Sequence, residues 1–363
     1  MNSSDRVKTT IGHKEPDRVP MHINASPFVV ESLFNRLRVR DEKCLLQALG
    51  IDIFDTRGID LHSGIAPEYV GPPHRLLKPG KEWGGNIMAL WNIQEYEKDS
   101  SHGKVIEIQN PPLSAQHSTV EWEEYSWPDV DWFSFADFGK DLNRFKNFSI
   151  MASGGSIFQH ASYLIGLDNQ LIDLLASPEK ALYILDKIFD FYYEYYSRMF
   201  ETAGDKIDIF ALADDFGTQT SLLIGDDLFD QYFSPRIRKM ADLAHRFDIS
   251  FLLHTCGNVE SLIPRFIELG VDVLDPIQPE SMDPGKIKKK FGNDICLRGG
   301  ISSQQVLAHG TVREVMEEVK QKLDILMPGG GYIFSPGHPV IQTDIPIENI
   351  ITMYKTAYDY GRY

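Results

Sequence analysis

The chain is poor in cysteine, in basic residues and in long apolar runs, and each shortage excludes a class of protein. Three cysteines in 363 residues, Cys44, Cys256 and Cys296, are too few and too widely spaced for a disulfide framework, which fits a reducing cytoplasm. Thirty-six basic against fifty-two acidic residues give 36 − 52 = −16, a balance that argues against nucleic acid and anionic membranes as partners. No run approaches the roughly 18 apolar residues of a membrane helix, and the start MNSSDR is not a secretory signal.

Eight short β-rich runs are present, and most alternate with stretches of helical periodicity. The runs are 19–23, 51–55, 149–154, 207–213, 249–254, 271–275, 294–298 and 331–335. Helix signals include Ser177-Pro178 ahead of a segment that reaches Phe200, a segment from Asn258 to Gly270, and the capping pair Thr311 and Glu314. This alternation predicts a single α/β domain over 1–363, folded as a (β/α)8 TIM barrel with an N-terminal extension.

The segment from about 60 to 147 interrupts this alternation between the second and third predicted strands. It holds all five tryptophans of the chain, Trp83, Trp91, Trp122, Trp127 and Trp132. Disordered segments are poor in large aromatic residues, so we expect an ordered insertion of hairpins and loops over the barrel mouth. The sequence leaves open whether this insertion is a lid over a substrate cleft or a packed structural element.

Residues with useful chemistry fall where the predicted strands end, which is where TIM barrels carry their active sites. These residues are Asp55, Asp214, Asp215, His254, Cys256, Asp275 and His338. We therefore expect them to converge in space.

The triplet His254-Thr255-Cys256 is the strongest candidate for a metal site. Residues two apart on a strand face the same side, and imidazole nitrogen and thiolate sulfur are preferred zinc donors. The alternative is a buried cysteine that acts as apolar filler. His338 is our choice for a third ligand; Asp215, Asp275 and Cys296 are the alternatives, although Cys296 lies inside a strand, where a packed thiol is favoured. Cys44 is interpreted as helix packing.

The neighbouring carboxyl groups of Asp214 and Asp215 could act as general acid or base. Adjacent residues on an extended segment face opposite ways, so one carboxylate would enter the site while the other is solvated or paired. We favour Asp215 as the residue that points inward.

Several motifs resemble those of the uroporphyrinogen decarboxylase superfamily of barrels. They are Asp17-Arg18-Val19-Pro20, Ala161-Ser162-Tyr163-Leu164-Ile165-Gly166, His254-Thr255-Cys256-Gly257 and Pro336-Gly337-His338. The resemblance covers nearly the whole chain. It implies one of two chemistries: metal-free decarboxylation of a tetrapyrrole, or zinc-dependent methyl transfer between a corrinoid and a thiol or similar acceptor.

The decarboxylase branch carries two arginines in its first strand, which bind the carboxylates of the substrate. The corresponding stretch here, 20–27, has none, which disfavours that activity. Asp55, Tyr163 and His338 still look like positions of that branch's site, so a metal-free decarboxylase remains the alternative function.

The methyltransferase branch has a His-x-Cys pair after strand five and a cysteine after strand eight, which together hold zinc. His254 and Cys256 match the pair, and His338 stands in place of the cysteine. The resemblance therefore implies a zinc methyltransferase with Asp215, Tyr163 and Asp55 as supporting catalytic groups, and a corrinoid (cobalamin) methyl carrier that is delivered by a partner protein.

Two further interpretations stay open. A non-catalytic partner or scaffold for a corrinoid protein is the rival from another class. The family resemblance and the cluster Tyr192, Tyr193, Tyr195 and Tyr196 allow a homodimer, but core packing explains the same rings.

Overall fold

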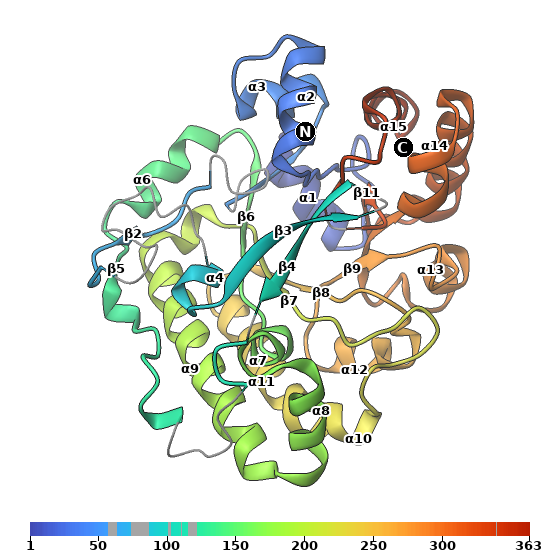
Figure 1. The fold of residues 1–363 in the computed structure, drawn as a ribbon. Helices are drawn as coiled ribbons and strands as arrows, with labels where there is room; N and C mark the ends of the chain where they lie inside the picture. Colours follow the sequence, from blue (N-terminus) through green and yellow to red (C-terminus); the bar gives the residue numbers. More distant parts are fainter. Residues whose placement is uncertain (57–63, 74–86, 101–102, 110, 115–121, 339) are drawn as a thin grey trace.

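The centre of the fold is a curled sheet of parallel strands (Figure 1). The structure is a computed structural model, and it describes residues 1–363 apart from 57–63, 74–86, 101–102, 110, 115–121 and 339. Among the described residues the sheet has seven strands, in spatial order β1 (Ile53–Asp55), β6 (Ser149–Ser153), β7 (Ile209–Ala213), β8 (Ser250–His254), β9 (Val273–Ile277), β10 (Cys296–Ile301) and β11 (Tyr332–Pro336). The spatial order follows the chain order, as in a barrel built from successive βα units.

The segment around Met21 takes the eighth position and closes the sheet. Met21 pairs in parallel with Phe334 of β11, and the amide of His22 donates to the Phe334 carbonyl at 3.0 Å. On the other side, the carbonyl of Met21 accepts from the amide of Asp52 at 2.9 Å, just before β1. The predicted (β/α)8 barrel is thus confirmed, although its first strand is reduced to a bridge.

Helices surround the sheet, as Figure 1 shows. The helices that follow the barrel strands are α7 (Phe158–Ile165), α8 (Leu167–Ala176), α9 (Pro178–Ala203), α10 (Asp226–Leu228), α11 (Ser234–His245), α12 (Ile263–Glu268), α13 (Pro284–Phe291), α14 (Val312–Leu326) and α15 (Ile347–Tyr360). Short helical turns lie at Gly204–Lys206, Phe229–Phe233, Glu260–Leu262 and Ser303–Leu307. The capping box of Thr311 and Glu314 is present. The region from Asn258 to Gly270 holds a 3-10 turn and then α12, where Pro264 occupies the first turn and has no amide to be satisfied.

The interior of the barrel has an apolar layer below a polar layer. Apolar side chains from all seven strands of the sheet meet inside it: Ile53, Met151, Ile209, Ala211, Leu252, Val273, Cys296 and Ile333. Because alternate residues of a strand share a face, the residues two positions further along line the next layer. That layer consists of Asp55, Ser153, His254, Asp275, Arg298 and Ser335. The C-terminal mouth of the barrel is therefore polar, and Cys296 is a packed thiol in the lower layer, as predicted.

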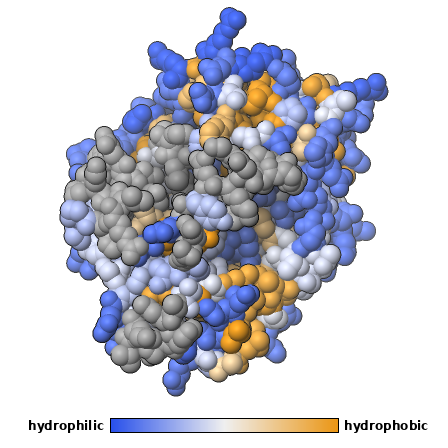
Figure 2. Space-filling view, in the orientation of Figure 1, coloured by the Kyte–Doolittle hydropathy of each residue, from blue (hydrophilic) through white to orange (hydrophobic). Residues whose placement is uncertain are grey.

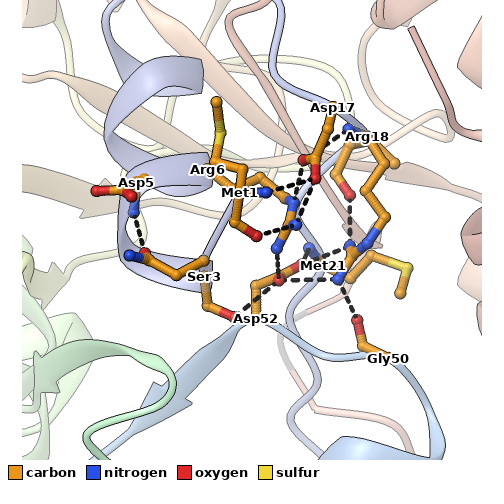
Figure 3. Close-up of polar contacts among 11 residues, drawn as sticks. Met1, Ser3, Asp5, Arg6, Asp17, Arg18, Met21, Gly50 and Asp52 are labelled. Atoms are coloured by element: carbon orange, nitrogen blue, oxygen red, sulfur yellow. Dashed lines mark hydrogen bonds and ion pairs between the residues drawn. The ribbon is translucent and has the colours of Figure 1, made fainter.

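The N-terminal end of the barrel is closed by α1 (Ser3–Ile11), whose Val7 packs into the apolar layer. The fully buried Asp52 fastens this helix, because it accepts from Arg6 at 2.7 Å, from Arg18 at 2.6 Å and from the Met21 amide at 3.0 Å (Figure 3). Arg6 also binds Asp17 at 2.7 Å, and this hydrogen bond holds the pKa of Asp17 well below its usual range. Two further helices, α2 (Pro27–Leu37) and α3 (Glu42–Ala48), follow the segment around Met21, and Cys44 lies in α3.

The described parts of the segment 60–147 form small sheets and short helices. Its elements are β2 (Glu68–Tyr69), α4 (Ile87–Leu90), β3 (Gln94–Ser100), β4 (Gly103–Gln109), Val130–Trp132, β5 (Phe133–Ser134), α6 (Phe138–Leu142) and Asn143–Phe145. β3 and β4 pair as an antiparallel hairpin, which crosses in front of the barrel strands in Figure 1. Trp91 and Trp122 are buried in the main core, whereas Trp83 lies outside the described residues. Burial of these rings favours a packed, ordered insertion.

Most of the visible surface is hydrophilic, and apolar side chains gather where α8 lies (Figure 2). Leu167, Ile172 and Leu175 of α8 are exposed. Among the described residues, no helix has the length and apolar character needed to cross a membrane. Three of the four clustered tyrosines of α9, Tyr192, Tyr195 and Tyr196, are buried within the chain, so core packing explains them.

Candidate metal centre and active site

Three side chains at the mouth of the barrel form a cluster that suits a metal ion. Asp215, His254 and Cys256 bring one ligand atom each to within 4.8 Å of one another. The Sγ of Cys256 lies 3.5 Å from the Nε2 of His254, and that nitrogen lies 3.7 Å from the Oδ1 of Asp215. His254 ends β8 and Asp215 follows β7, so the pairing of these two strands brings the three groups together.

The imidazole of His254 is held by a buried ion pair beneath it. Its Nδ1 lies 2.5 Å from Oδ2 of Asp275, and Arg298 contacts the same carboxylate through Nε at 2.5 Å and Nη2 at 2.7 Å. A carboxylate acceptor holds a proton on Nδ1, so Nε2 is the ring nitrogen that faces the cluster and that can bind a metal ion once it is deprotonated. A carboxylate that orients a histidine in this way is typical of metal sites.

Backbone geometry places Cys256 beside the imidazole. Gly257 has a φ of +89°, and a Cβ there would lie 2.5 Å from the carbonyl carbon of Gly217, so only glycine fits. The amide of Gly257 donates to Oε1 of Gln278 at 2.6 Å, and the amide of Cys256 donates to Oδ1 of Asp215 at 2.8 Å. The turn after β8 is thus fixed from two sides.

Two of the three separations between the ligand atoms fit tetrahedral zinc, and the third lies within 4.8 Å. Nitrogen, oxygen and sulfur ligands lie about 2.0–2.3 Å from zinc, which separates neighbouring ligand atoms by about 3.4–3.6 Å. The distances of 3.5 and 3.7 Å around His254 come within a few tenths of an ångström of this geometry. Three protein ligands leave a fourth position open for a substrate, as in catalytic zinc sites.

The proton affinities of the cluster are shifted by burial and by close charges. Burial alone lowers the pKa of His254, but Cys256 and the hydrogen bond to Asp275 outweigh it and raise that pKa well above its usual value. Burial raises the pKa of Cys256, although the neighbouring imidazole opposes the shift. Burial also tends to raise the pKa of Asp275, but Arg298 and His254 hold it well below its ordinary range. Asp275 is therefore a carboxylate that can orient the imidazole throughout the neutral range.

Asp214 and Asp215 take different directions, as the sequence suggested. Asp214 is fully buried and accepts from the amides of Ile157, at 2.9 Å, and Gln159, at 3.0 Å, at the start of α7. Burial raises its pKa to about 7, against the opposing effect of these amides. Asp215 instead lies in the metal cluster, where Gln159 donates to its Oδ2 at 2.6 Å.

His338, our sequence-based choice for the third ligand, does not join this cluster. The group of three formed by described residues contains Asp215 in its place. The Nδ1 of His338 lies 3.0 Å from the carbonyl of Val340, and the amide of Gly337 donates to the Ile301 carbonyl at 2.7 Å. Among the described residues, the fold thus brings Asp215, one of the alternative ligands, to His254 and Cys256.

Of the other two predicted catalytic residues, one ends a barrel strand and the other lies on the helix that follows β6. Asp55 ends β1 and accepts a short hydrogen bond from the hydroxyl of Ser153 at the end of β6. Tyr163 lies on α7, one helical turn beyond Gln159. Its half-buried ring packs edge-on against the ring of His160, with the two ring centroids 6.0 Å apart. Their catalytic roles stay predictions.

Sequence reasoning missed two residues of the site. Arg298 could have been found, because it lies two residues after Cys296 on the same face of β10. Gln159 gave no signal, since it reaches Asp215 only through the packing of α7 against the end of β7.

Fold and site together define the class: a (β/α)8 barrel with a candidate metal centre at its C-terminal mouth. The family described as uroporphyrinogen decarboxylase (URO-D) matches residues 142–360, and the chain belongs to this family. That stretch holds β6 to β11 and all three residues of the cluster.

Relatives of this chain include methyltransferases. The chain is 27% identical over 215 residues to the methylcobamide:CoM methyltransferase MtbA of Methanosarcina acetivorans, which covers 59% of each protein. It is 24% identical over 164 residues to the methylated-thiol–coenzyme M methyltransferase of Methanosarcina mazei, covering 45% of this chain and 42% of that protein. The chain thus matches about three-fifths or less of the length of these relatives.

A solved structure supports the fold over the whole chain. A methyltransferase from Methanosarcina mazei superposes with a TM-score of 0.69, covers 99% of both chains and is 16% identical. At this identity the likeness concerns the fold alone. The relatives and the missing first-strand arginines agree in placing the chain nearer the methyltransferase branch than the decarboxylase branch.

Proposed function

We propose that this protein is a zinc-dependent methyltransferase that moves a methyl group between a corrinoid and a thiol. The observation that carries the proposal is the cluster of Asp215, His254 and Cys256, whose spacing suits zinc and leaves a coordination position open. The names of the relatives, which pair methylcobamide with a thiol acceptor, supply the substrate classes.

Each residue of the cluster has a defined task in this proposal. His254, Cys256 and Asp215 hold the ion, and Asp275 keeps the donor nitrogen of His254 directed at it. Zinc bound here supplies a Lewis acid that keeps a coordinated thiol in its thiolate form at neutral pH. Asp55, at the end of β1, and Tyr163, on α7, are proposed to contact the substrates.

The corrinoid is proposed to arrive on a separate carrier protein at the polar mouth of the barrel. The segment from about 60 to 147 then serves as an insertion near the site, within a chain that acts as one domain in the cytoplasm. A test for the carrier is co-purification of a corrinoid-containing protein with the tagged chain.

The function is tested by metal content and by a direct assay. Purified protein is expected to contain about one zinc per chain, and Cys256→Ala and His254→Ala are expected to lose it. Methylcobalamin and coenzyme M, the acceptor named for the relatives, serve as first substrates, and loss of the methyl group from cobalt changes the visible spectrum. Transfer should stop on treatment with a chelator and return with added zinc.

Three outcomes would overturn the proposal in different ways. A metal-free protein that decarboxylates a porphyrinogen would support the decarboxylase alternative. A protein that binds a corrinoid carrier without changing the cobalt spectrum, with any donor or acceptor, would support a scaffold. Equal zinc content in wild type and Cys256→Ala would show that zinc is not bound at this cluster.

A further inference from the structure

The consecutive residues Asp214 and Asp215 both bind a single residue of α7, Gln159. The carboxylate of Asp214 accepts from the backbone amide of Gln159 at 3.0 Å, and the carboxylate of Asp215 accepts from its side-chain Nε2 at 2.6 Å. One aspartate therefore fixes the position of the glutamine, and the next aspartate receives its side chain. Neither the sequence motifs nor the family assignment accounts for this arrangement.

Asp214 fixes where α7 begins. It is completely buried, and it accepts from the amide of Ile157, the residue before the helix, and from the amide of Gln159 in the first turn, where helix amides have no partner within the helix. The residue before the helix, Ile157, has no side chain that could cap these amides, so Asp214 at the end of β7 takes that task. The backbone of Gln159 is thereby tied to the strand that carries Asp215.

Asp215 is held through both oxygens. Its Oδ2 accepts from Gln159 and its Oδ1 accepts from the amide of Cys256 at 2.8 Å. The plane of the carboxylate is thus fixed, with Oδ1 3.7 Å from the Nε2 of His254. An aspartate with a third of its side chain exposed would otherwise sample several rotamers.

We infer that Gln159 is the positioning residue that fixes Asp215 as the third ligand of the metal centre. This inference rests on the proposed zinc function. The side chain of Gln159 is long enough for its amide to donate to Oδ2 of Asp215, while the ligand oxygen Oδ1 stays directed at the cluster. Residues that hydrogen-bond to a metal ligand typically change metal affinity about 10–100-fold when they are replaced.

The test uses Co²⁺ alone as the probe, because its visible absorption reports both affinity and coordination geometry. Gln159→Met keeps the length of the side chain and removes the donor, and it should weaken Co²⁺ binding about tenfold or more and alter the absorption bands. Gln47→Met is the matched control, since Gln47 is exposed on α3 and lines a cavity, together with residues of α15, that contains none of the three residues of the cluster. Its affinity and spectrum should equal those of wild type.

A reciprocal exchange separates this role from simple packing. Gln159→Glu replaces the donor by a carboxylate that repels Asp215, so it should also weaken binding about tenfold or more. When Gln159→Glu is added to Asp215→Asn, the Co²⁺ affinity should fall less than about threefold below that of the Asp215→Asn single variant. The reason is that the asparagine can donate a hydrogen bond to the new carboxylate and keep its own oxygen on the ion.

The outcomes distinguish this inference from the proposed function. If wild type and Gln47→Met bind neither Co²⁺ nor zinc, the metal centre itself is refuted. If wild type binds Co²⁺ and Gln159→Met binds it within twofold with an unchanged spectrum, the positioning role is refuted while the metal centre stands. Equal losses from Gln159→Glu in both backgrounds would likewise refute it.

Discussion

Replacing Asp275 by asparagine should weaken zinc binding and destabilise the fold at the same time. Asp275 is almost fully buried, and it receives both the imidazole of His254 and the guanidinium of Arg298. Asparagine keeps the shape but removes the charge, so Arg298 is left buried without a carboxylate partner. It can also present an amide hydrogen to His254, which would turn or retautomerise the ring.

The size of both effects follows from these contacts. Loss of a carboxylate that orients a metal-bound histidine costs about 10–100-fold in metal affinity. Breaking a buried ion pair by removing one partner costs about 3–5 kcal/mol. For a chain of this length the entropy of unfolding is about 0.8 kcal/mol/K, so Tm should fall by about 4–7 °C.

The assay measures zinc affinity by competition with a chromophoric chelator at a temperature where both proteins are folded, and Tm by circular dichroism. Asp208→Asn is the control, because Asp208 is a buried carboxylate just before β7, at the opposite end of the barrel, where it binds Ser4 and Ser149. It should lower Tm without changing zinc affinity. The reasoning is refuted if Asp275→Asn binds zinc within twofold of wild type, or if Asp208→Asn loses zinc to the same degree.

Three further predictions concern the third ligand, the turn after β8 and the acid limit of stability. His338→Ala should leave zinc affinity within about threefold of wild type, whereas Asp215→Ala should lower it about tenfold or more; the reverse order in the same competition assay would restore histidine as the ligand. Gly257→Ala should lower the free energy of unfolding by about 1–3 kcal/mol and reduce the zinc content, because φ at this position is +89° and the added Cβ would clash with Gly217. Denaturant unfolding measures the first quantity and metal analysis the second. Unchanged values of both would contradict this account of the turn. The folded-state pKa of Asp17 lies below its unfolded value, so its contribution to stability is present above about pH 4 and is lost as pH falls further. Asp17→Asn should therefore destabilise the protein by no more than about 1 kcal/mol at pH 7 and make unfolding less sensitive to pH between about 4 and 2, and an unchanged acid dependence would count against this ion pair.

Local patterns determined the framework of the barrel. Apolar runs bounded by helix signals predicted all eight strand positions, since hydrophobic periodicity depends on residues close in sequence. The same period of two predicted that His254 and Cys256 face one side, and it could have predicted Arg298 above Cys296. These features need no knowledge of which segments meet in space.

The choice of the third group in the cluster was decided by the tertiary structure. From the sequence, Asp215, Asp275 and His338 were all strand-end residues with suitable atoms. Their separation depends on strand register and on loop paths: Asp275 lies under His254, Asp215 beside it, and the loop after β11 draws His338 to the backbone of Val340. Gln159 belongs to the same category, because the contact of its side chain with Asp215 spans 56 positions of the chain. Sequence periodicity fixes the face on which a side chain lies, whereas distances between faces of different strands arise only when the sheet closes.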